Sequence, residues 1–358
     1  MLALRLVRGT HPLVQLRRLL VAAAAAGVGF LLLCALGYAV GHPTQSATSA
    51  LRLLWCALPL AATVQFAVAV ARTDPSTRPR QGLDAVGLGP ARLTALAAAS
   101  TAVACTLGSA VALLIYLHLR GDITGLPFDG AAAELLAADQ PLPLAAALTL
   151  LAILPVTAAT AAGLALRPRT PAQASPQPTG LPWGVALIAL GLALETYAGR
   201  SGGGGVLAGW ILTAAGLAMA GPGLTHWCGR LLQTVRPGAV RLLAGRVLMD
   251  ESRRIGRPLG VVCAVGSGAV AALALGTDFG PLAGLGAALV IGCTTATLLT
   301  AALESKQSRT HTTEALLRIG APPTILRTTA LLRAAALLTV FVPLTWTVGE
   351  LAAVPLRV

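Results

Sequence analysis

Long apolar runs alternate with short polar stretches along the whole chain. Each run is about 17 to 25 residues long, which is the length that an α-helix needs to cross roughly 30 Å of hydrocarbon. Alternating strand patterns of about ten residues, which are typical of membrane β-barrels, do not occur. The pattern predicts nine membrane-spanning helices, at residues 19–40, 51–72, 94–118, 142–165, 182–198, 206–223, 258–276, 281–303 and 328–349.

The polar stretches between these spans differ in chemistry. Glycine and Gly-Pro pairs at residues 199–205 and 277–281 predict tight turns. The acidic stretch 121–141 is too short for a domain of its own. It is either a solvated loop or, over residues 129–138, a short interfacial helix. The proline-rich stretch 167–181 predicts an extended linker.

Two basic segments have apolar residues at helical spacing. One lies within residues 225–257, before the seventh predicted span, and the other covers residues 2–16, before the first. Apolar residues at that spacing with arginines between them predict amphipathic helices on the inner membrane surface. The front and rear parts of the chain therefore each begin with a predicted surface helix.

The composition agrees with a membrane solvent. Of 358 residues, 56% are hydrophobic and only 11% are charged, and the mean hydropathy is +0.78. That leaves too little polar surface for a water-soluble fold of this size. Since backbone groups in lipid must pair internally, we expect an all-α fold, a polytopic transmembrane helical bundle.

The formal net charge of +13 would suggest nucleic-acid binding in a soluble protein. Here the arginines gather on alternate loops and no aromatic surface accompanies them, which argues against nucleic acid as a partner. The distribution follows the positive-inside rule and predicts the N-terminus inside and the C-terminus outside. The first apolar run is longer than a signal-peptide core of roughly 7 to 15 residues, so we expect it to stay as a span.

The sequence offers little catalytic or metal-binding chemistry. It has no G-x-x-x-x-G-K-[ST] phosphate loop and no H-E-x-x-H motif. The six cysteines form no C-x-x-C pair and fit the pattern of small buried hydrophobes. We therefore predict that the chain is not an enzyme, and that it holds no metal and no cofactor.

Few charges or motifs stand out inside the predicted spans. Glu195 and Arg333 are the only strong candidates, and both lie near a span end, where snorkelling to the interface is the favoured interpretation. A coupling-ion site at Glu195 is the alternative. The spacings Gly180-x-x-x-Gly184 and Gly280-x-x-x-Gly284 would permit close helix contact, but chance produces such spacings in a chain with 39 glycines.

Two loops predicted to face the cytosol have similar sequences, at residues 78–90 and 311–323. A membrane span follows each of them. When the loops are aligned, four positions match, namely Gln81 with Glu314, Leu83 with Leu316, Gly87 with Gly320, and Pro90 with Pro323. A repeated polar helix at the membrane face suggests a docking element. The simpler alternative is a surface helix that only connects two spans and reverses the direction of the chain.

The order of surface helix, two spans, short polar helix and further span resembles the membrane core of FtsX-like ABC transporter permeases, the MacB and Bce-type class. The second loop matches that family's pattern at Glu314, Leu316, Leu317, Arg318, Gly320 and Ala321. The first loop departs from it, since Gln81 replaces the acidic residue. We therefore expect the second loop to be the better docking element and the first its weakened copy.

The resemblance implies two parallel FtsX-like repeats joined by two linking spans. On this scheme residues 1–166 form the first transmembrane repeat, 167–224 the linker and two connecting spans, and 225–358 the second repeat, which lacks its last span. The chain would then be a shortened or degenerate member of the family.

The resemblance also implies a function, namely that of the membrane-spanning subunit of an ABC transporter. A separate cytosolic ABC ATPase, as a dimer that carries ATP and Mg, would drive export or extraction of a hydrophobic or amphipathic compound. The expected ATPase-docking residues are Glu314, Leu316, Leu317, Arg318, Gly320, Pro323, Gln81, Leu83, Gly87 and Pro90.

The setting and the alternatives follow from the same reasoning. Rich usage of alanine, leucine and arginine with Lys306 as the sole lysine suggests a GC-rich bacterial genome, so we expect a multi-pass protein of the bacterial plasma membrane, in contact with lipid and open to homo-oligomer formation. Two alternatives remain open. One is a secondary carrier, and the other is a non-transporting degenerate permease that serves as a membrane anchor or signalling partner.

Overall fold

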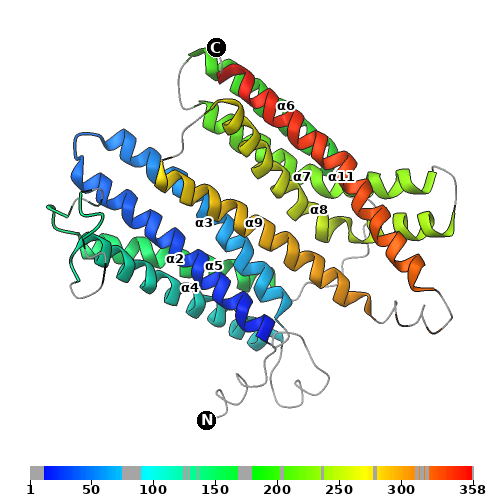
Figure 1. Ribbon diagram of the computed structural model, residues 1–358, viewed down its shortest axis with the longest axis horizontal. Helices are drawn as coiled ribbons and strands as arrows, with labels where there is room; N and C mark the ends of the chain where they lie inside the picture. Colours follow the sequence, from blue (N-terminus) through cyan, green and yellow to red (C-terminus); the bar gives the residue numbers. More distant parts are fainter. Residues whose placement is uncertain are drawn as a thin grey trace, which may run out of the picture. The chain divides into compact units, whose positions relative to one another are not determined.

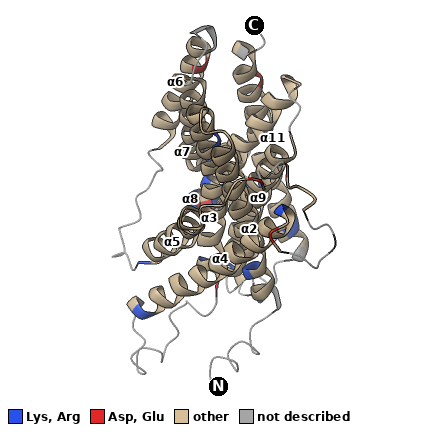
Figure 2. Cartoon of the chain, turned by 90° about the vertical axis from the view of Figure 1, so that its left-hand side faces the viewer, with Lys and Arg blue, Asp and Glu red and all other residues tan. Residues whose placement is uncertain are grey.

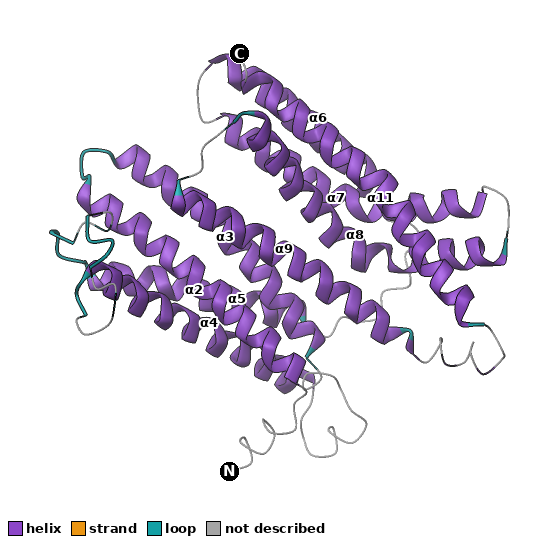
Figure 3. Ribbon diagram, viewed as in Figure 1, coloured by secondary structure: helices purple, strands orange, loops and turns teal. Residues whose placement is uncertain are grey.

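The structure is a computed structural model that describes residues 12–74, 90–123, 127, 130–134, 136, 138–167, 180–201, 205–234, 238–276, 280–310, 314, 318 and 322–356. Within these ranges the regular structure is entirely helical and no strand occurs (Figure 3). The predicted all-α fold is confirmed for this part of the chain.

The long helices are α2 (Pro12–Gly41), α3 (Ser46–Thr73), α4 (Pro90–Arg120), α5 (Leu144–Ala165), α6 (Gly180–Ser201), α7 (Gly205–Thr234), α8 (Ala239–Ala274), α9 (Pro281–Ser308) and α11 (Pro323–Ala353), and a short 3₁₀ turn, η3 (Val354–Leu356), follows the last. In the described ranges, these nine long helices are each long and apolar enough to cross a membrane. Most of their length carries no charge (Figure 2). The number and the positions of the predicted spans are thus matched by helices, as expected for a multi-pass membrane protein.

The helix α8 differs from its prediction. It runs without a break for 36 residues through Pro258, whereas the sequence predicted a separate surface helix followed by a span from residue 258. A basic amphipathic segment and an apolar segment share the same helical period, so hydropathy alone gives no signal that they belong to one helix. Residues 225–234 likewise belong to the end of α7.

The contacts divide the chain into two compact units. Unit 1 comprises Met1–Thr170 and Phe279–Thr297, and unit 2 comprises Pro171–Asp278 and Leu298–Val358. The helix α9 is therefore shared, with its first part in unit 1 and its end in unit 2.

In unit 1, α2 packs against α3, α4 and α5, and these helices lie side by side in Figure 1. The buried core includes Val28 of α2, Phe66 of α3, Cys105 of α4 and Leu154 of α5. Interlocked apolar side chains of this kind make the four helices one packed body, with dispersion contacts as a main source of cohesion.

The acidic loop after α4 is held against the end of that helix. The backbone N–H of Ala132 donates to the carbonyl oxygen of Leu119 at 3.0 Å, and buried Leu136 packs in the cluster that contains Tyr116. The described residues of the loop form turns rather than a helix. The alternative of an interfacial helix is therefore wrong for them. Asp122, Glu134 and Asp139 are exposed, as expected for a solvated acidic loop, and the contacts of Ala132 and Leu136 anchor that loop.

In unit 2, α7 packs between α6 and α8, and α11 packs against α8. Glycines allow the backbones to approach closely. A Cβ atom added at Gly184 of α6 would lie 2.6 Å from the backbone nitrogen of Ala220 in α7, and one added at Gly260 of α8 would lie 2.3 Å from the carbonyl oxygen of Leu217. Small residues at such seams are the usual way for membrane helices to gain contact.

The two Gly-x-x-x-Gly spacings in the sequence have different surroundings in the structure. An added Cβ atom would meet α7 backbone at 2.9 Å from Gly180 and at 2.6 Å from Gly184, whereas one added at Gly280 or Gly284 would have no described residue within 4 Å. The same Gly-x-x-x-Gly spacing therefore gives a close helix contact in one case and open space in the other.

Candidate functional site

Four of the ten predicted docking residues lie in the described part of the chain. Glu314 and Arg318 have helical backbone geometry and are exposed, while Pro90 and Pro323 are the first residues of α4 and α11. The other six lie outside the described residues, namely Gln81, Leu83, Gly87, Leu316, Leu317 and Gly320.

Both prolines suit their positions. The first residues of a helix have no intrahelical partner for their N–H groups, so a proline there loses nothing, and its fixed φ angle favours the helical conformation. The helices that Pro90 and Pro323 begin are both 31 residues long. Proline thus marks the point where each predicted docking loop ends and the next span starts.

A buried carboxylate contacts both helices that flank the second loop, α9 and α11, which we call the stems of that loop. Glu251 of α8 accepts a hydrogen bond from the hydroxyl of Ser305, in the last turn of α9, and forms an ion pair with Arg309, the first residue after α9. Its second oxygen lies 3.7 Å from Nη1 of Arg333 in α11. One side chain therefore links three helices, which we call the Glu251 cluster (Glu251, Ser305, Arg309 and Arg333).

The electrostatics of the Glu251 cluster explain why its members meet. The Glu251 side chain is 9% exposed, and those of Arg309 and Arg333 are 24% and 23% exposed. A carboxylate so far from water is costly unless it is paired and hydrogen-bonded. Two guanidinium groups and a hydroxyl supply those partners.

The position of Arg333 departs from the snorkelling interpretation. Its Nη1 faces Glu251, and its Nε donates to the carbonyl oxygen of Thr329 at 3.4 Å. A buried acidic partner on a neighbouring helix, which hydropathy along the chain cannot reveal, decides where the guanidinium goes.

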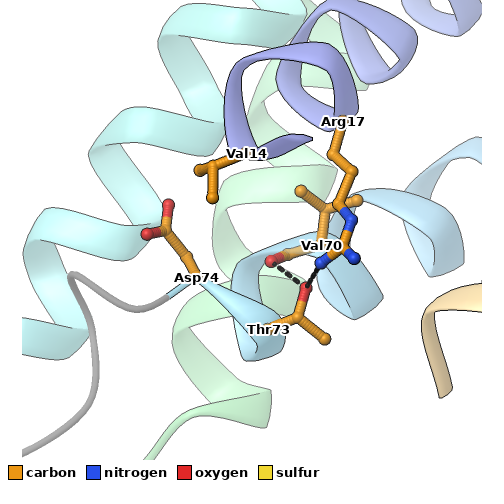
Figure 4. A pocket seen from close by; sticks show the side chains of 5 residues that line it. All are labelled: Val14, Arg17, Val70, Thr73 and Asp74. Carbon is orange, nitrogen blue, oxygen red and sulfur yellow. Dashed lines mark hydrogen bonds between the residues drawn. The ribbon is translucent and has the colours of Figure 1, made fainter. Parts of the chain in front are cut away.

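Unit 1 has a related arrangement at the start of the first loop. Asp74, the first residue after α3, is buried and forms an ion pair with Arg18 of α2. Nη1 of Arg17 donates to Oγ1 of Thr73 at 3.3 Å. Figure 4 shows Arg17, Thr73 and Asp74 around a small notch, together with Val14 and Val70. Sequence reasoning missed the ion pairs of Asp74 and Glu251, although charged residues at the ends of spans were a visible signal.

Glu195 is a second buried acid, on α6. It is 1% exposed, and its Oε1 accepts a hydrogen bond from Oγ1 of Thr213 in α7 at 3.1 Å. Its Oε2 has no hydrogen-bond partner within the described ranges. The snorkelling interpretation is wrong for Glu195, because the side chain points between two closely packed helices. A Cβ atom at Gly209 would lie only 2.5 Å from its Cγ.

The remaining candidate chemistry is sparse. All six cysteines are free and buried, in line with their prediction as small hydrophobes. No group of three or more His, Cys, Asp and Glu side chains that could hold a metal ion occurs in the ranges that the structure describes. The arrangement that stands out is the set of ion pairs that join helices to one another.

The comparisons with known proteins found no matching family model, curated protein or solved structure. The functional argument therefore rests on the residues and contacts of this chain.

Proposed function

We propose that this chain is the membrane-spanning subunit of an ABC transporter of the FtsX-like kind. A separate ATPase would drive export or extraction of a hydrophobic or amphipathic compound through it. The observation that carries the proposal is the Glu251 cluster. It fastens both helices that flank the loop at 311–323 to the long helix α8.

Such a loop needs rigid stems if it is to transmit force. Loop 311–323 begins just after α9 and ends where α11 starts. Arg309 and Ser305 hold the first stem to Glu251, and Arg333 holds the second. Because partly buried ion pairs with good partners resist separation, a push on the loop would move α8, α9 and α11 together.

The exposed charges suit a docking contact. Glu314 and Arg318 both have helical backbone geometry and are four residues apart, which is the spacing of neighbours on one face of a helix. In a helix-in-groove contact, Leu316 and Leu317 would enter an apolar groove of the ATPase, and the two charges would set the register. Gly320 would end the helix, and the prolines after it would prevent its continuation.

Orientation and repeats form part of the proposal. Positive charge on alternate loops favours the N-terminus inside, which puts both loops on the side where a cytosolic ATPase would bind. Equal helix lengths support two repeats, since α3 and α9 have 28 residues each and α4 and α11 have 31 each. On this arrangement, loop 78–90 would be the weaker docking element.

The proposal is tested by association with an ATPase. The intact chain should co-purify with a cytosolic ABC ATPase from its own cells and should move substrate in liposomes only when ATP is present. The double substitution Leu316→Asp/Leu317→Asp should abolish association by placing charge in the groove, whereas Gln307→Asp, at an exposed position of α9, should not. If the intact protein never associates with an ATPase, the proposal fails. Association without ATP-dependent transport would instead indicate a membrane anchor or signalling partner.

A secondary carrier is the second candidate, and Glu195 is the observation that favours it. A buried carboxyl with one oxygen lacking a hydrogen-bond partner in the described ranges is the kind of group that could bind a coupling proton. The substitution Glu195→Gln separates the candidates. It should leave ATP-driven transport largely unchanged, and complete loss of an ion-gradient-driven flux would favour the carrier.

A further inference from the structure

The two ion-pair sites occupy matching positions in the chain. Asp74 is the first residue after α3 and Arg309 is the first residue after α9, and both helices have 28 residues. Their partners also match. Arg18 lies on α2 and Glu251 lies on α8. The number of residues from Arg18 to Gly41, where α2 ends, equals the number from Glu251 to Ala274, where α8 ends. The charges are reversed, since the acid follows the second helix in unit 1 and lies on the first helix in unit 2.

The last turn before each pair is also built alike. Oγ1 of Thr73 donates to the carbonyl oxygen of Val70 at 3.0 Å, and Oγ of Ser308 donates to the carbonyl oxygen of Ser305 at 2.9 Å. Thr73 and Ser308 are the last residues of α3 and α9. Both helices therefore end in a hydroxyl bond to the backbone followed at once by a charged residue.

We propose that Arg18–Asp74 and Glu251–Arg309 are one clamp built twice with opposite charge, each holding the end of its second helix against its first. Charge reversal at both partners together keeps the attraction, whereas reversal at one partner places two like charges side by side, one of them at a buried position. The pair therefore tolerates this exchange only as a unit, and the two clamps differ at both partners.

The two clamps differ in one arm. In unit 2, Arg333 joins a third helix, α11, to the clamp. Counted from the first residue of each helix, Pro323 of α11 and Pro90 of α4, the position in α4 that matches Arg333 is Ser100. Oγ of Ser100 donates to the carbonyl oxygen of Ala97 in its own helix at 2.9 Å. In unit 2 the Glu251 cluster thus fastens both stems of its loop.

The clamp itself rests on contacts inside each unit, and only its use in passing ATP-driven movement to the spans rests on the proposed function. Hydrogen exchange measured by mass spectrometry on the purified full chain tests the clamp without any ATPase. The readouts are the amides at the end of α9, residues 303–309, and those at the end of α3, residues 68–74. Each segment serves as the internal reference for substitutions in the other unit.

In unit 2, Glu251→Arg should speed exchange at residues 303–309 about tenfold or more, because the end of α9 then frays against a repelled arginine. Asp250→Arg is the matched control, since Asp250 is the exposed neighbour of Glu251 with the same charge, and it should change nothing. The triple variant Glu251→Arg/Arg309→Asp/Arg333→Ser rebuilds the charge order of unit 1 and should restore slow exchange.

In unit 1, Asp74→Arg should speed exchange at residues 68–74, and Arg18→Asp/Asp74→Arg should restore it. Unchanged exchange in the single variants would overturn the clamp, and so would failure of the triple and double variants to restore protection. If a single variant loses its fold altogether, recovery of the fold by its charge-exchanged partner counts in favour, and no recovery counts against. Restored protection in a chain that binds no ATPase would leave the clamp standing while the proposed function fails.

Discussion

The glycine seam between α7 and α8 yields a prediction whose size follows from the structure. A Cβ atom at Gly260 would lie 2.3 Å from the carbonyl oxygen of Leu217 and 3.0 Å from Cα of Ala218. Both are backbone atoms, so no side chain can turn away to make room. The substitution Gly260→Ala therefore forces α8 away from α7 by about 1 Å, a gap that forfeits a quarter to a half of each affected contact.

The matched control is Gly292→Ala, because none of the residues that the structure describes would lie within 4 Å of a Cβ atom added at Gly292 of α9. Both substitutions replace glycine by alanine inside a helix, so the intrinsic gain of about 1 kcal/mol in helix propensity is common to both. Their difference isolates the overlap at the seam. Overpacking of this kind costs roughly 1–3 kcal/mol.

The assay is unfolding of the purified protein in detergent, followed by tryptophan fluorescence. We expect Gly292→Ala to match or exceed the unsubstituted chain and Gly260→Ala to be less stable than Gly292→Ala by about 1–3 kcal/mol, a decrease of several degrees in Tm. Gly256→Ala should add less than its own effect to Gly260→Ala, because the helices have already separated. Equal stability of Gly260→Ala and Gly292→Ala would refute the close approach of α7 and α8.

Two further predictions concern buried polar groups. Glu195→Gln should change the free energy of unfolding by less than about 1 kcal/mol, because the amide oxygen can still accept the Thr213 hydroxyl bond. A large loss in thermal unfolding would mean that the carboxyl is needed as such. Arg120→Met should free the loop after α4, because buried Arg120 donates to the carbonyl oxygen of Gln140 and pairs with Asp122 at 3.3 Å. Hydrogen exchange over residues 130–140 should rise several-fold, whereas the control Arg52→Met, which removes an exposed guanidinium 3.4 Å from the Tyr38 ring, should leave that loop unchanged. An equal rise in both variants would contradict the anchoring role of Arg120.

The helices themselves were predictable because lipid is a simple solvent. It requires every backbone group to pair internally and every span to be about 20 apolar residues long. The fourth predicted span, 142–165, differs from α5 (Leu144–Ala165) by two residues at one end. The prediction was wrong where two segments share one period, as at α8, because continuity of a helix through Pro258 leaves no mark on hydropathy.

The candidate site was less predictable. The ten expected docking residues follow from the similarity of the two loops and from the family resemblance. The contacts that would hold such a loop come instead from Glu251, Arg309 and Arg333. Glu251 and Arg309 lie far apart in the chain, and only the tertiary structure brings their side chains together. The signal available in the sequence was an acid among arginines at the start of a long helix.

The sequence by itself thus determined the solvent, the helical class, the number of spans and the two similar loops, because these depend on composition and on order along one dimension. The tertiary structure decided which polar groups pair with one another. It turned Glu195 toward Thr213, Arg333 toward Glu251, and Arg18 toward Asp74. The physical reason is that a charge in a poorly hydrated place takes the nearest partner in space, and separation in sequence does not enter that choice.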